Sequence, residues 1–493
     1  MNEQRQETTS WYHGISRYQW LVLIVASLGW VFDIFEGQIF VASMKEAMPA
    51  LLPVGGSIQD VPFYTNITFA AFLFGGALGG VAFGVLSDRV GRKRTLTYTI
   101  LVYSLFTCLS ALASTWWEMA AYRFLVALGV GGEWAVASAF VAEVFPQRAR
   151  AWSQSIFHAS SVLGTYLAVA AGTLIVANPR LTTTLSLLGH DFSLTGWRMG
   201  FLLGVVPALL IIWIRVCLRE PERWLTAQNA AIEAESNKQS EEIVAADSSE
   251  AIATLGQLTA SPLPSTARSM QRTRPVAADV RVKPSVGQLF GAGLLRRTLV
   301  GVGLAAVGLA TFWGTHIYGK DVFQQAYRLS TGEQNPEVLK HMEMLGMFLV
   351  TTGGGLGLIA FGPICERLGR RGAFLFFHVG GLAASLALFK QVSGMTAVAV
   401  LLPIFGFLTL GMHAGYAVYF PELFPTRLRS TGGGFCFNFG RILAAPILFL
   451  SGWMQTKLGF GLNNAAALLS LLFAVGVLIL WFAPETKGQD LPA

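Results

Sequence analysis

The chain has 493 residues, of which 53% are hydrophobic and only 13% are charged, and its mean hydropathy is +0.53. Because a soluble domain averages about 25% charged residues, this composition excludes a soluble enzyme or binding module and indicates a membrane protein. The net charge of +7 does not require a nucleic acid as partner, since the positions of the charges explain it.

Apolar runs long enough to cross a bilayer recur along the chain. Each crossing needs about 20 residues, because the hydrocarbon core is about 30 Å thick, and we count about twelve such runs. The sequence therefore predicts an all-α membrane protein with about twelve transmembrane helices. Their expected extents are 18–44, 61–86, 95–114, 116–142, 152–177, 197–219, 298–326, 342–364, 373–391, 394–420, 430–452 and 459–483.

Basic residues gather in alternate short loops, as in "DRVGRKR" (88–94) and "PTRLR" (425–429). The positive-inside rule places such loops in the cytoplasm. We therefore expect a multi-pass protein of the plasma membrane, the inner membrane in a bacterium, with both termini cytoplasmic.

The two halves of the chain resemble each other. "GVLSDRVGRKRTL" (84–96) aligns with "GPICERLGRRGAF" (362–374), and "AEVFPQRARAWS" (142–153) aligns with "PELFPTRLRSTG" (421–432). Such a duplication is the usual construction of a transporter that rocks two pseudo-symmetric bundles about a central site. The expected division is an N-terminal tail (1–17), a six-helix bundle (18–225), a flexible polar linker (226–297), a second six-helix bundle (298–483) and a C-terminal tail (484–493).

The loop at 84–94 resembles the signature loop of the major facilitator superfamily. The matching residues are Gly84, Leu86, Asp88, Arg89, Gly91, Arg92 and Lys93. "RFLVALGVGG" (123–132) is similar to the fourth-helix pattern of that family, although Ala127 stands where a glycine is expected. "REPERWL" (219–225) and "PETKG" (484–488) look like the closing signatures of its sugar porters and of its metabolite:proton, aromatic-acid and sialic-acid symporters.

The resemblance implies a gate at the cytoplasmic side, where the carboxylate Asp88 lies among basic residues. We expect Asp88 and Arg92 to contact the neighbouring helix ends, with Glu143 and Arg150 as partners, and the second half to repeat the arrangement. The expected gate residues are Asp88, Arg89, Gly91, Arg92, Glu143, Arg150, Glu366, Arg370, Glu422 and Arg429.

Two carboxylates, Asp33 and Glu36, stand within the first apolar run, where a charge is costly. At 1.5 Å per residue, Asp33 and Arg123 reach about the same depth from opposite faces. In the proton-coupled sugar porters that the chain resembles, an Asp on helix one pairs with an Arg on helix four. We therefore expect Asp33 to pair with Arg123, and one of the two carboxyl groups to bind the coupled proton. A structural salt bridge without a proton role is the alternative.

Arg441 lies near the midplane of the eleventh run, with Asn438 on the same helical face, and is the best candidate to bind an anionic substrate. Helix packing is the alternative role for this arginine. Glu133 and His158 are further candidates, for an inner gate. Weaker candidates for the substrate site are Gln38, Trp134, Trp313, His316, His413 and Tyr416.

The sequence thus predicts a secondary active transporter, a proton-coupled symporter of a small organic anion of the carboxylate type. A proton-coupled sugar symporter is the main alternative, and a transceptor that signals through its linker is a weaker one. No nucleophile and base, metal cluster or cofactor loop stands out, so we expect neither an enzyme nor a bound cofactor or metal. The expected partners are a small-molecule substrate, protons and the lipid bilayer, with no nucleic acid and with the chain as a monomer.

Overall fold

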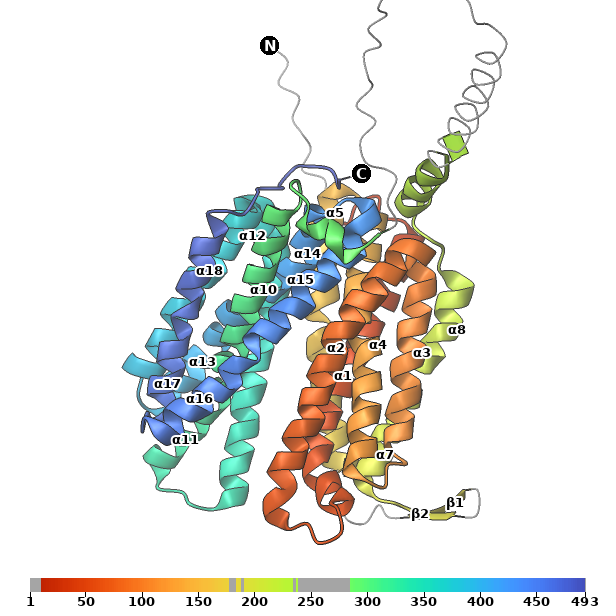
Figure 1. The fold of residues 1–493 in the computed structure, drawn as a ribbon. Coiled ribbons are helices and arrows are strands. Elements are labelled where there is room, and N and C mark those ends of the chain that lie inside the picture. The colour runs from red at the N-terminus through yellow and green to blue at the C-terminus, as the bar shows by residue number, and fades with distance from the viewer. Residues whose placement is uncertain (1–9, 177–182, 188–189, 234–235, 238–283, 493) are drawn as a thin grey trace, which may run out of the picture.

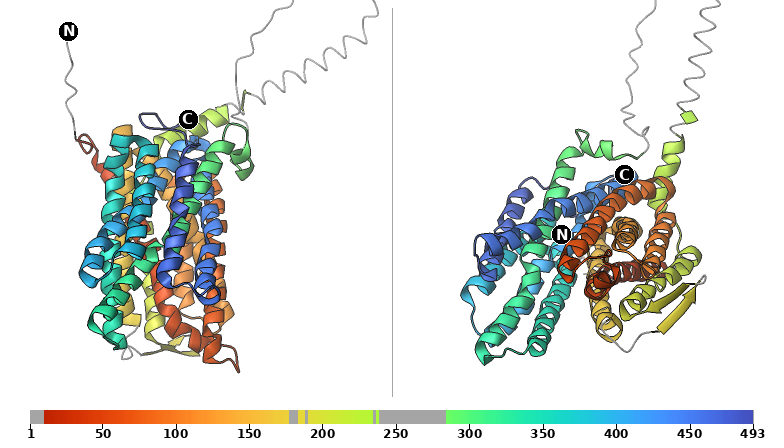
Figure 2. Two further views of the ribbon diagram at one scale, coloured as in Figure 1. Left: turned by 90° about the vertical axis from the view of Figure 1, so that its left-hand side faces the viewer. Right: turned by 60° about the horizontal axis from the view of Figure 1, so that its bottom comes forward.

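The computed structural model describes residues 10–176, 183–187, 190–233, 236–237 and 284–492. Its helices form two bundles, α1 to α8 on the right of Figure 1 and α10 to α18 on the left. We call the face where the described chain begins and ends, uppermost in Figure 1, the terminal face, and the opposite face the distal face. Figure 2 shows the bundles from two further directions.

The first bundle contains six membrane crossings, and the last two are each built from shorter helical pieces. The elements are α1 (Arg17–Leu51), η1 (Ile58–Asp60), α2 (Val61–Val90), α3 (Arg92–Ser110), α4 (Trp116–Val144), α5 (Gln147–Ala159), α6 (Ser161–Ala171), η2 (Gly172–Val176), α7 (Gly196–Leu202), η3 (Leu203–Val205) and α8 (Ala208–Cys217).

The second bundle repeats this arrangement. Its elements are η4 (Val286–Phe290), α10 (Leu295–Gly314), η5 (His316–Tyr318), α11 (Gly319–Thr331), α12 (Pro336–Leu386), η6 (Ala387–Gln391), α13 (Met395–Leu410), α14 (His413–Leu423), η7 (Thr426–Leu428), α15 (Arg429–Ala444), α16 (Pro446–Lys457), α17 (Leu462–Ser470) and α18 (Leu472–Leu480).

Nine helical stretches among the described residues are long and apolar enough to cross a bilayer, and one of them, 336–391, is long enough for two crossings. When the shorter or more polar helices are counted as well, the chain has the twelve-helix fold that hydropathy predicted. Glycine permits the sharp reversal at the corresponding place in each half. Gly91 separates α2 from α3 with φ of 111°, and Gly369 breaks α12 with φ of 79°, a region that side chains with a Cβ rarely adopt.

Small residues allow the helices of each bundle to approach closely. A Cβ atom at Gly79 of α2 would lie 2.0 Å from the backbone oxygen of Leu128 of α4. In the other half, a Cβ at Gly353 of α12 would lie 2.0 Å from the backbone oxygen of Pro403 of α13. The glycines of these helices therefore serve packing of backbone against backbone.

A short antiparallel hairpin that hydropathy did not predict lies between the fifth and sixth crossings. Its strands are β1 (Thr183–Leu187) and β2 (His190–Leu194), with Thr183 opposite Leu194. Most of the predicted linker (226–297) lies outside the described residues. Within its described part, η4 buries Leu289, and α10 begins three residues earlier than the predicted start at 298.

Candidate functional site

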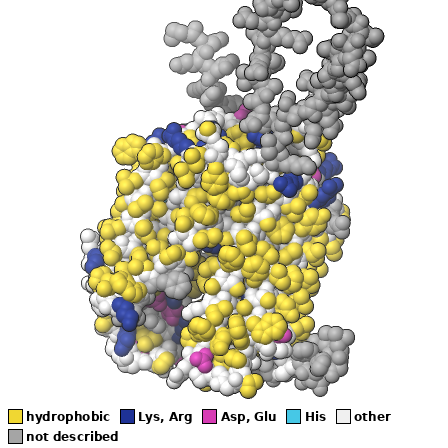
Figure 3. Space-filling model, viewed as in Figure 1, with side chains coloured by type: hydrophobic (Ala, Val, Ile, Leu, Met, Phe, Trp, Pro, Cys, Tyr) yellow, Lys and Arg dark blue, Asp and Glu magenta, His cyan; other side chains and the backbone are white. Residues whose placement is uncertain are grey.

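A cavity of about 320 Å³ lies between the two bundles. Asp33 of α1 and Arg441 of α15 line it from opposite halves, and its wall continues to Lys320 at the start of α11. Figure 3 shows the surface hollowed between the halves near the distal face, with charged side chains around the hollow. The cavity therefore reaches from the middle of the protein toward the distal side.

Aromatic side chains from both halves form much of the cavity wall. Phe69 of α2 and Trp313 of α10 meet across the bundles with their ring centroids 6.5 Å apart. A small number of polar groups in a mostly apolar wall is the usual composition of a binding pocket for a small molecule. The aromatic residues of the wall are Trp30, Phe69, Phe72, Phe312, Trp313 and Phe437.

The expected pair between Asp33 and Arg123 is wrong. Arg123 forms its ion pair with Glu36, which also accepts a hydrogen bond of 3.1 Å from the Thr107 hydroxyl. The guanidinium lies 4.3 Å above the ring of Phe40. Three residues turn an α-helix by about 300°, so Asp33 and Glu36 differ in direction by roughly 60°. That rotation directs Glu36 to α4 and leaves Asp33 facing the cavity.

Asp33 and Arg441 are the two charged groups at the inner part of the cavity. Neither carboxylate oxygen of Asp33 has a hydrogen-bond partner among the described residues. Arg441 lies over the Phe437 ring at 5.3 Å and interacts electrostatically with Asp33. Space for its guanidinium comes from Gly76 of α2, where a Cβ would lie 3.0 Å away. A guanidinium and a carboxyl group thus face one space.

Three histidines also line the cavity, and two of them are fixed by hydrogen bonds to other side chains. His316 shares a hydrogen bond of 2.7 Å with the Thr409 hydroxyl, and His158 accepts one of 3.2 Å from the Trp134 indole. Nε2 of His413 is buried without a partner among the described residues. At the distal end, Lys320 is already neutralised by Glu343.

The other expected substrate residues divide into two groups. Gln38 lies in the cavity wall. The second group lies behind the wall in this conformation and consists of Asn438, Trp134 and Tyr416. Each of these side chains is held by a hydrogen bond to the backbone or by stacking on another ring. Asn438 donates to the backbone oxygens of Gly131 and Gly434 at 3.2 and 3.0 Å, Trp134 stacks on Phe437 at 4.2 Å, and Tyr416 donates to the backbone oxygen of Leu304 at 3.0 Å.

Hydropathy gave no means to identify Trp30, Phe69, Phe72, His158, Phe312 or Lys320 as neighbours in one wall, since they come from five different crossings. Apart from Lys320, these residues carry aromatic rings, which was the available signal, but aromatic residues are also common in the packing between helices. Only the arrangement of the helices separates the two roles.

On the terminal side of the cavity, ionic contacts join the halves. The carboxylate of Asp88 accepts hydrogen bonds from the backbone of Ser430 at 3.2 Å and of Thr431 at 2.8 Å, and from the Thr431 hydroxyl at 2.6 Å. It thereby caps the start of α15, whose helix dipole favours a negative charge there. Arg92 holds Asp88 in place with an ion pair of 2.6 Å.

Glu143 extends this contact between the halves. It pairs with Arg92 of its own half at 2.8 Å and with Arg429 of the other half at 2.7 Å. Arg429 also donates to the backbone oxygen of Pro492 at 2.8 Å. The terminal face is therefore closed in this structure.

The second half does not mirror the first. Glu422 pairs with Arg370 at 2.7 Å, but its other close contact is the Thr486 hydroxyl at 2.5 Å. Arg150 of the first half aligns with Arg429 of the second half and was expected at the gate. It is buried and donates only from Nε, to the backbone oxygen of Ala142 at 3.2 Å, while its terminal nitrogens have no partner among the described residues.

The remaining expected gate residues make local contacts. Glu366 lies 3.4 Å from Arg370 of the same half, and Arg89 donates to the backbone oxygen of Pro284 at 2.9 Å. Gly91 forms the turn beside Glu220, whose carboxylate oxygens accept hydrogen bonds from the first backbone N–H groups of α3. The contacts of Glu366 and Gly91 stay within one half, whereas Arg89 reaches the segment just before η4.

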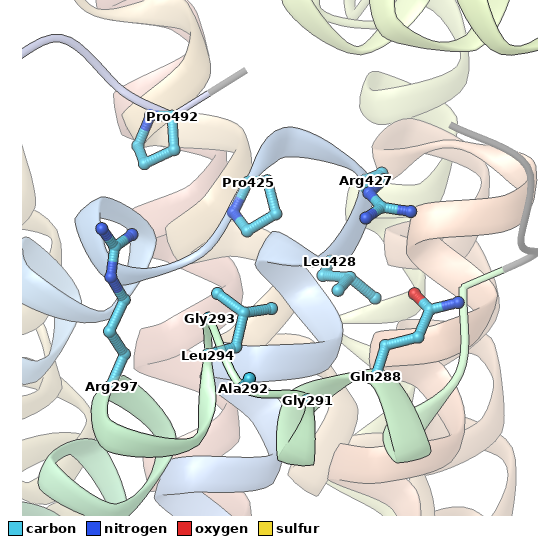
Figure 4. Close-up of a pocket in the computed structure, with 10 residues that line it drawn as sticks. All are labelled: Gln288, Gly291, Ala292, Gly293, Leu294, Arg297, Pro425, Arg427, Leu428 and Pro492. Atoms are coloured by element: carbon cyan, nitrogen blue, oxygen red, sulfur yellow. The ribbon is translucent and has the colours of Figure 1, made fainter. Parts of the chain in front are cut away.

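A larger recess of about 650 Å³ lies at the terminal face (Figure 4). Arg297 and Arg427 border it, and all of its wall comes from the second half of the chain and the C-terminal segment. Because alternating access requires a site between the two halves, this recess does not fit a transport site. In the part of the chain that the structure describes, no group of His, Cys, Asp and Glu is suited to hold a metal ion.

Comparison with known proteins agrees with this fold. The chain is 27% identical over 485 residues to a putative metabolite transport protein of Haemophilus influenzae, covering 97% of this chain and 99% of that one. It is 25% identical over 495 residues to the sialic acid transporter NanX of Escherichia coli, covering 98% and 97%.

Among solved structures, the proton:xylose symporter XylE superposes with a TM-score of 0.69 at 19% identity, covering 96% of this chain and 98% of that one. At this identity the likeness concerns the fold alone. The family described as "Sugar (and other) transporter" matches residues 21–493. The chain therefore belongs to this transporter family, within the major facilitator superfamily, and is an integral membrane transporter.

Proposed function

We propose that the protein is a symporter that carries a small organic anion together with a proton by alternating access. The observation that carries this proposal is the pair of Arg441 and Asp33, which face one cavity from opposite halves. The guanidinium attracts a carboxylate, and the carboxyl group can take up a proton. The resemblance to the sialic acid transporter NanX is consistent with an acidic substrate.

The two groups also suggest how the fluxes are coupled. In the empty cavity, Arg441 stabilises the negative charge of Asp33. A substrate carboxylate that binds Arg441 reduces this stabilisation, so Asp33 binds a proton when the anion binds. A monovalent anion and one proton then cross together without net charge, which lowers the cost of moving them through the membrane interior.

The wall of the cavity favours an acid with an apolar or aromatic body. A sugar would need a hydrogen-bond partner for each of several hydroxyl groups, and buried polar groups without partners are costly. The aromatic wall instead offers flat apolar surface to a ring. A neutral sugar is the second candidate, since a proton:xylose symporter shares the fold.

Several finer assignments belong to the same proposal. The terminal face is the cytoplasmic one, because the basic loops lie there, so the protein is closed toward the cytoplasm in this conformation. The membrane is the inner membrane of a bacterium. One chain supplies both sides of the cavity, so a monomer suffices. The substrate leaves chemically unchanged, and the protein is not an enzyme.

The experiment that tests the proposal is substrate-induced thermal stabilisation of the purified protein. Benzoate and nicotinate would be compared with their neutral amides, benzamide and nicotinamide. Sialic acid would be tested as a further acid, and xylose as a neutral sugar. We expect an acid to stabilise the wild type and its neutral analogue to do so much less.

Arg441→Lys should weaken the effect sharply, because an ammonium cannot reproduce bidentate binding of a carboxylate, and Arg441→Ala should remove it. Arg328→Lys, at an exposed arginine of α11, is the matched control and should behave as wild type. Equal stabilisation of wild type by an acid and its neutral analogue would refute the anion proposal, and stabilisation by xylose alone would support the sugar alternative.

A further inference from the structure

Glu133 of α4 is a buried carboxyl group that the proposed coupling does not use. It is 1% exposed, and neither of its oxygens has a hydrogen-bond partner of regular geometry among the described residues. The Tyr103 hydroxyl of α3 lies beside it and is likewise without a regular hydrogen bond. An ionised carboxylate without a partner in an apolar interior is very costly. Glu133 is therefore expected to carry a proton in this conformation.

The backbone of α1 is shaped to admit this group. A Cβ atom at Gly29 would lie 2.1 Å from Oε1 of Glu133, so only a glycine leaves room for the carboxyl group. Gly29 precedes Asp33 by four residues, or about 6 Å along the helix. Positions four apart lie on the same helical face. Glu133 thus lies against the face of α1 that carries Asp33, about one turn closer to the terminal side.

The charges around the cavity are unequal in number. Glu36 neutralises Arg123, and Arg441 faces Asp33, which leaves no cation to pair with Glu133 in the part of the chain that the structure describes. Hence one more carboxyl group than guanidinium is present, and one proton balances the cluster. The titratable groups that interact with Glu133 are Asp33 on α1 and Tyr103 on α3. Asp33 in turn interacts with Glu36 and Arg441, and His158 bonds Trp134, the residue after Glu133.

We propose that Glu133 is the proton-release site of the transporter, and this rests on the proposed symport. Asp33 takes up the proton from the cavity as the anion binds. When the gate at Asp88 opens, Glu133 gives its proton to water on the terminal side and becomes a carboxylate. The O–H bond of Asp33 then breaks as a new O–H bond forms on Glu133, directly or through water. Asp33 returns to its ionised form beside Arg441, ready for the next cycle.

The test separates proton uptake from proton release. The probe is the acid from the panel above that stabilises the wild type most. A pH-sensitive dye would measure the protons taken up when this acid binds to detergent-solubilised protein. Proteoliposomes would measure accumulation driven by a proton gradient and, separately, exchange of labelled for unlabelled acid at equal pH.

Glu133→Gln should bind the acid and take up a proton as the wild type does, and should retain exchange, but should lose at least tenfold in driven accumulation. Asp33→Asn should lose both proton uptake and accumulation. Gly29→Ala, whose Cβ displaces the Glu133 carboxyl group, should resemble Glu133→Gln, while Glu133→Asp should recover part of the accumulation. Glu46→Gln, at an exposed position of α1, is the matched control and should change none of the three.

Normal accumulation by Glu133→Gln would overturn the proposal. Loss of binding-coupled proton uptake in this variant would also overturn it, because Glu133 would then be the group that takes up the proton. Loss of exchange would assign Glu133 to binding or to the conformational change instead. If the wild type itself takes up no proton and accumulates no acid, the proposed symport fails, which is a distinct result.

Discussion

Asp88 accepts three hydrogen bonds from the other half, from the backbone and hydroxyl of Thr431 and from the backbone of Ser430. These bonds stabilise the closed gate, because they exist only when the halves meet at the terminal face. Replacement by asparagine removes the negative charge and keeps one oxygen acceptor. A hydrogen bond to a charged group contributes about 1.5 to 3 kcal/mol and a neutral one about 0.5 to 1.5. We therefore expect Asp88→Asn to destabilise the closed state by about 2 to 3 kcal/mol, or about 30- to 150-fold in the equilibrium constant.

Cysteine accessibility would measure this shift. Ser138 is 2% exposed and donates to the backbone oxygen of Ala417 in the other half, so it is covered only while the terminal face is closed. Ser138→Cys, in a background without the four native cysteines, should be alkylated from the terminal side much faster when Asp88→Asn is added.

Glu366→Gln is the matched comparison, because Glu366 occupies the equivalent place and its one hydrogen bond among the described residues stays within its own half. It should change the labelling rate little. Unchanged labelling together with unchanged transport in Asp88→Asn would show that these bonds do not hold the gate closed.

Two further predictions concern the loops of the terminal face. Gly91→Ala should lower the free energy of unfolding by about 1 to 3 kcal/mol, because φ is 111° there and the new Cβ would lie 2.4 Å from Oε1 of Glu220. The melting temperature in detergent would measure this loss of stability. Gly293→Ala, where the new Cβ would have open space around it, is the control. Partial burial alone would raise the pKa of Glu485. Four backbone N–H groups, however, donate to its carboxylate and lower the pKa below its ordinary value, those of Arg370, Lys487, Arg371 and Thr486. Since the folded-state pKa is the lower one, the stabilisation is present above the unfolded pKa of about 4.3 and is lost as the pH falls through the folded value. The difference in melting temperature between wild type and Glu485→Gln should therefore be full near pH 6 and shrink steadily below pH 4, and a pH-independent difference would contradict this account.

The number and order of the crossings could be read from the sequence because they depend on local properties. A run of about 20 apolar residues is long enough to span the bilayer wherever it occurs in the chain. The repeat of the loop at 84–96 in 362–374 likewise indicated two similar halves before any helix was placed. The reversal at Gly91 recurs at Gly369 for the same local reason, a backbone conformation that favours glycine.

The site could be predicted only in part. Depth along a helix placed Asp33, Arg123 and Arg441 near the middle of the membrane, but depth does not say which way a side chain points. The rotation of α1 about its axis, set by packing against α4 and α6, decided that Glu36 and not Asp33 meets Arg123. The rotation of α15 likewise turns Asn438 to a hydrogen bond with Gly131 of α4, which removes it from the cavity wall.

The departure from symmetry at the gate also needed the tertiary structure. Sequence alignment of the halves gives Glu143 and Glu422 equal places, as it does Arg150 and Arg429. Yet Arg429 crosses to Glu143, whereas Thr486 of the C-terminal segment contacts Glu422 and Arg150 pairs with no carboxylate among the described residues. The sequence by itself thus determined how many helices cross the membrane and which residues lie at which depth, because these follow from hydrophobic length. Which of those residues touch was decided by helix rotation and by contacts between segments more than 60 positions apart, which only the packed structure defines.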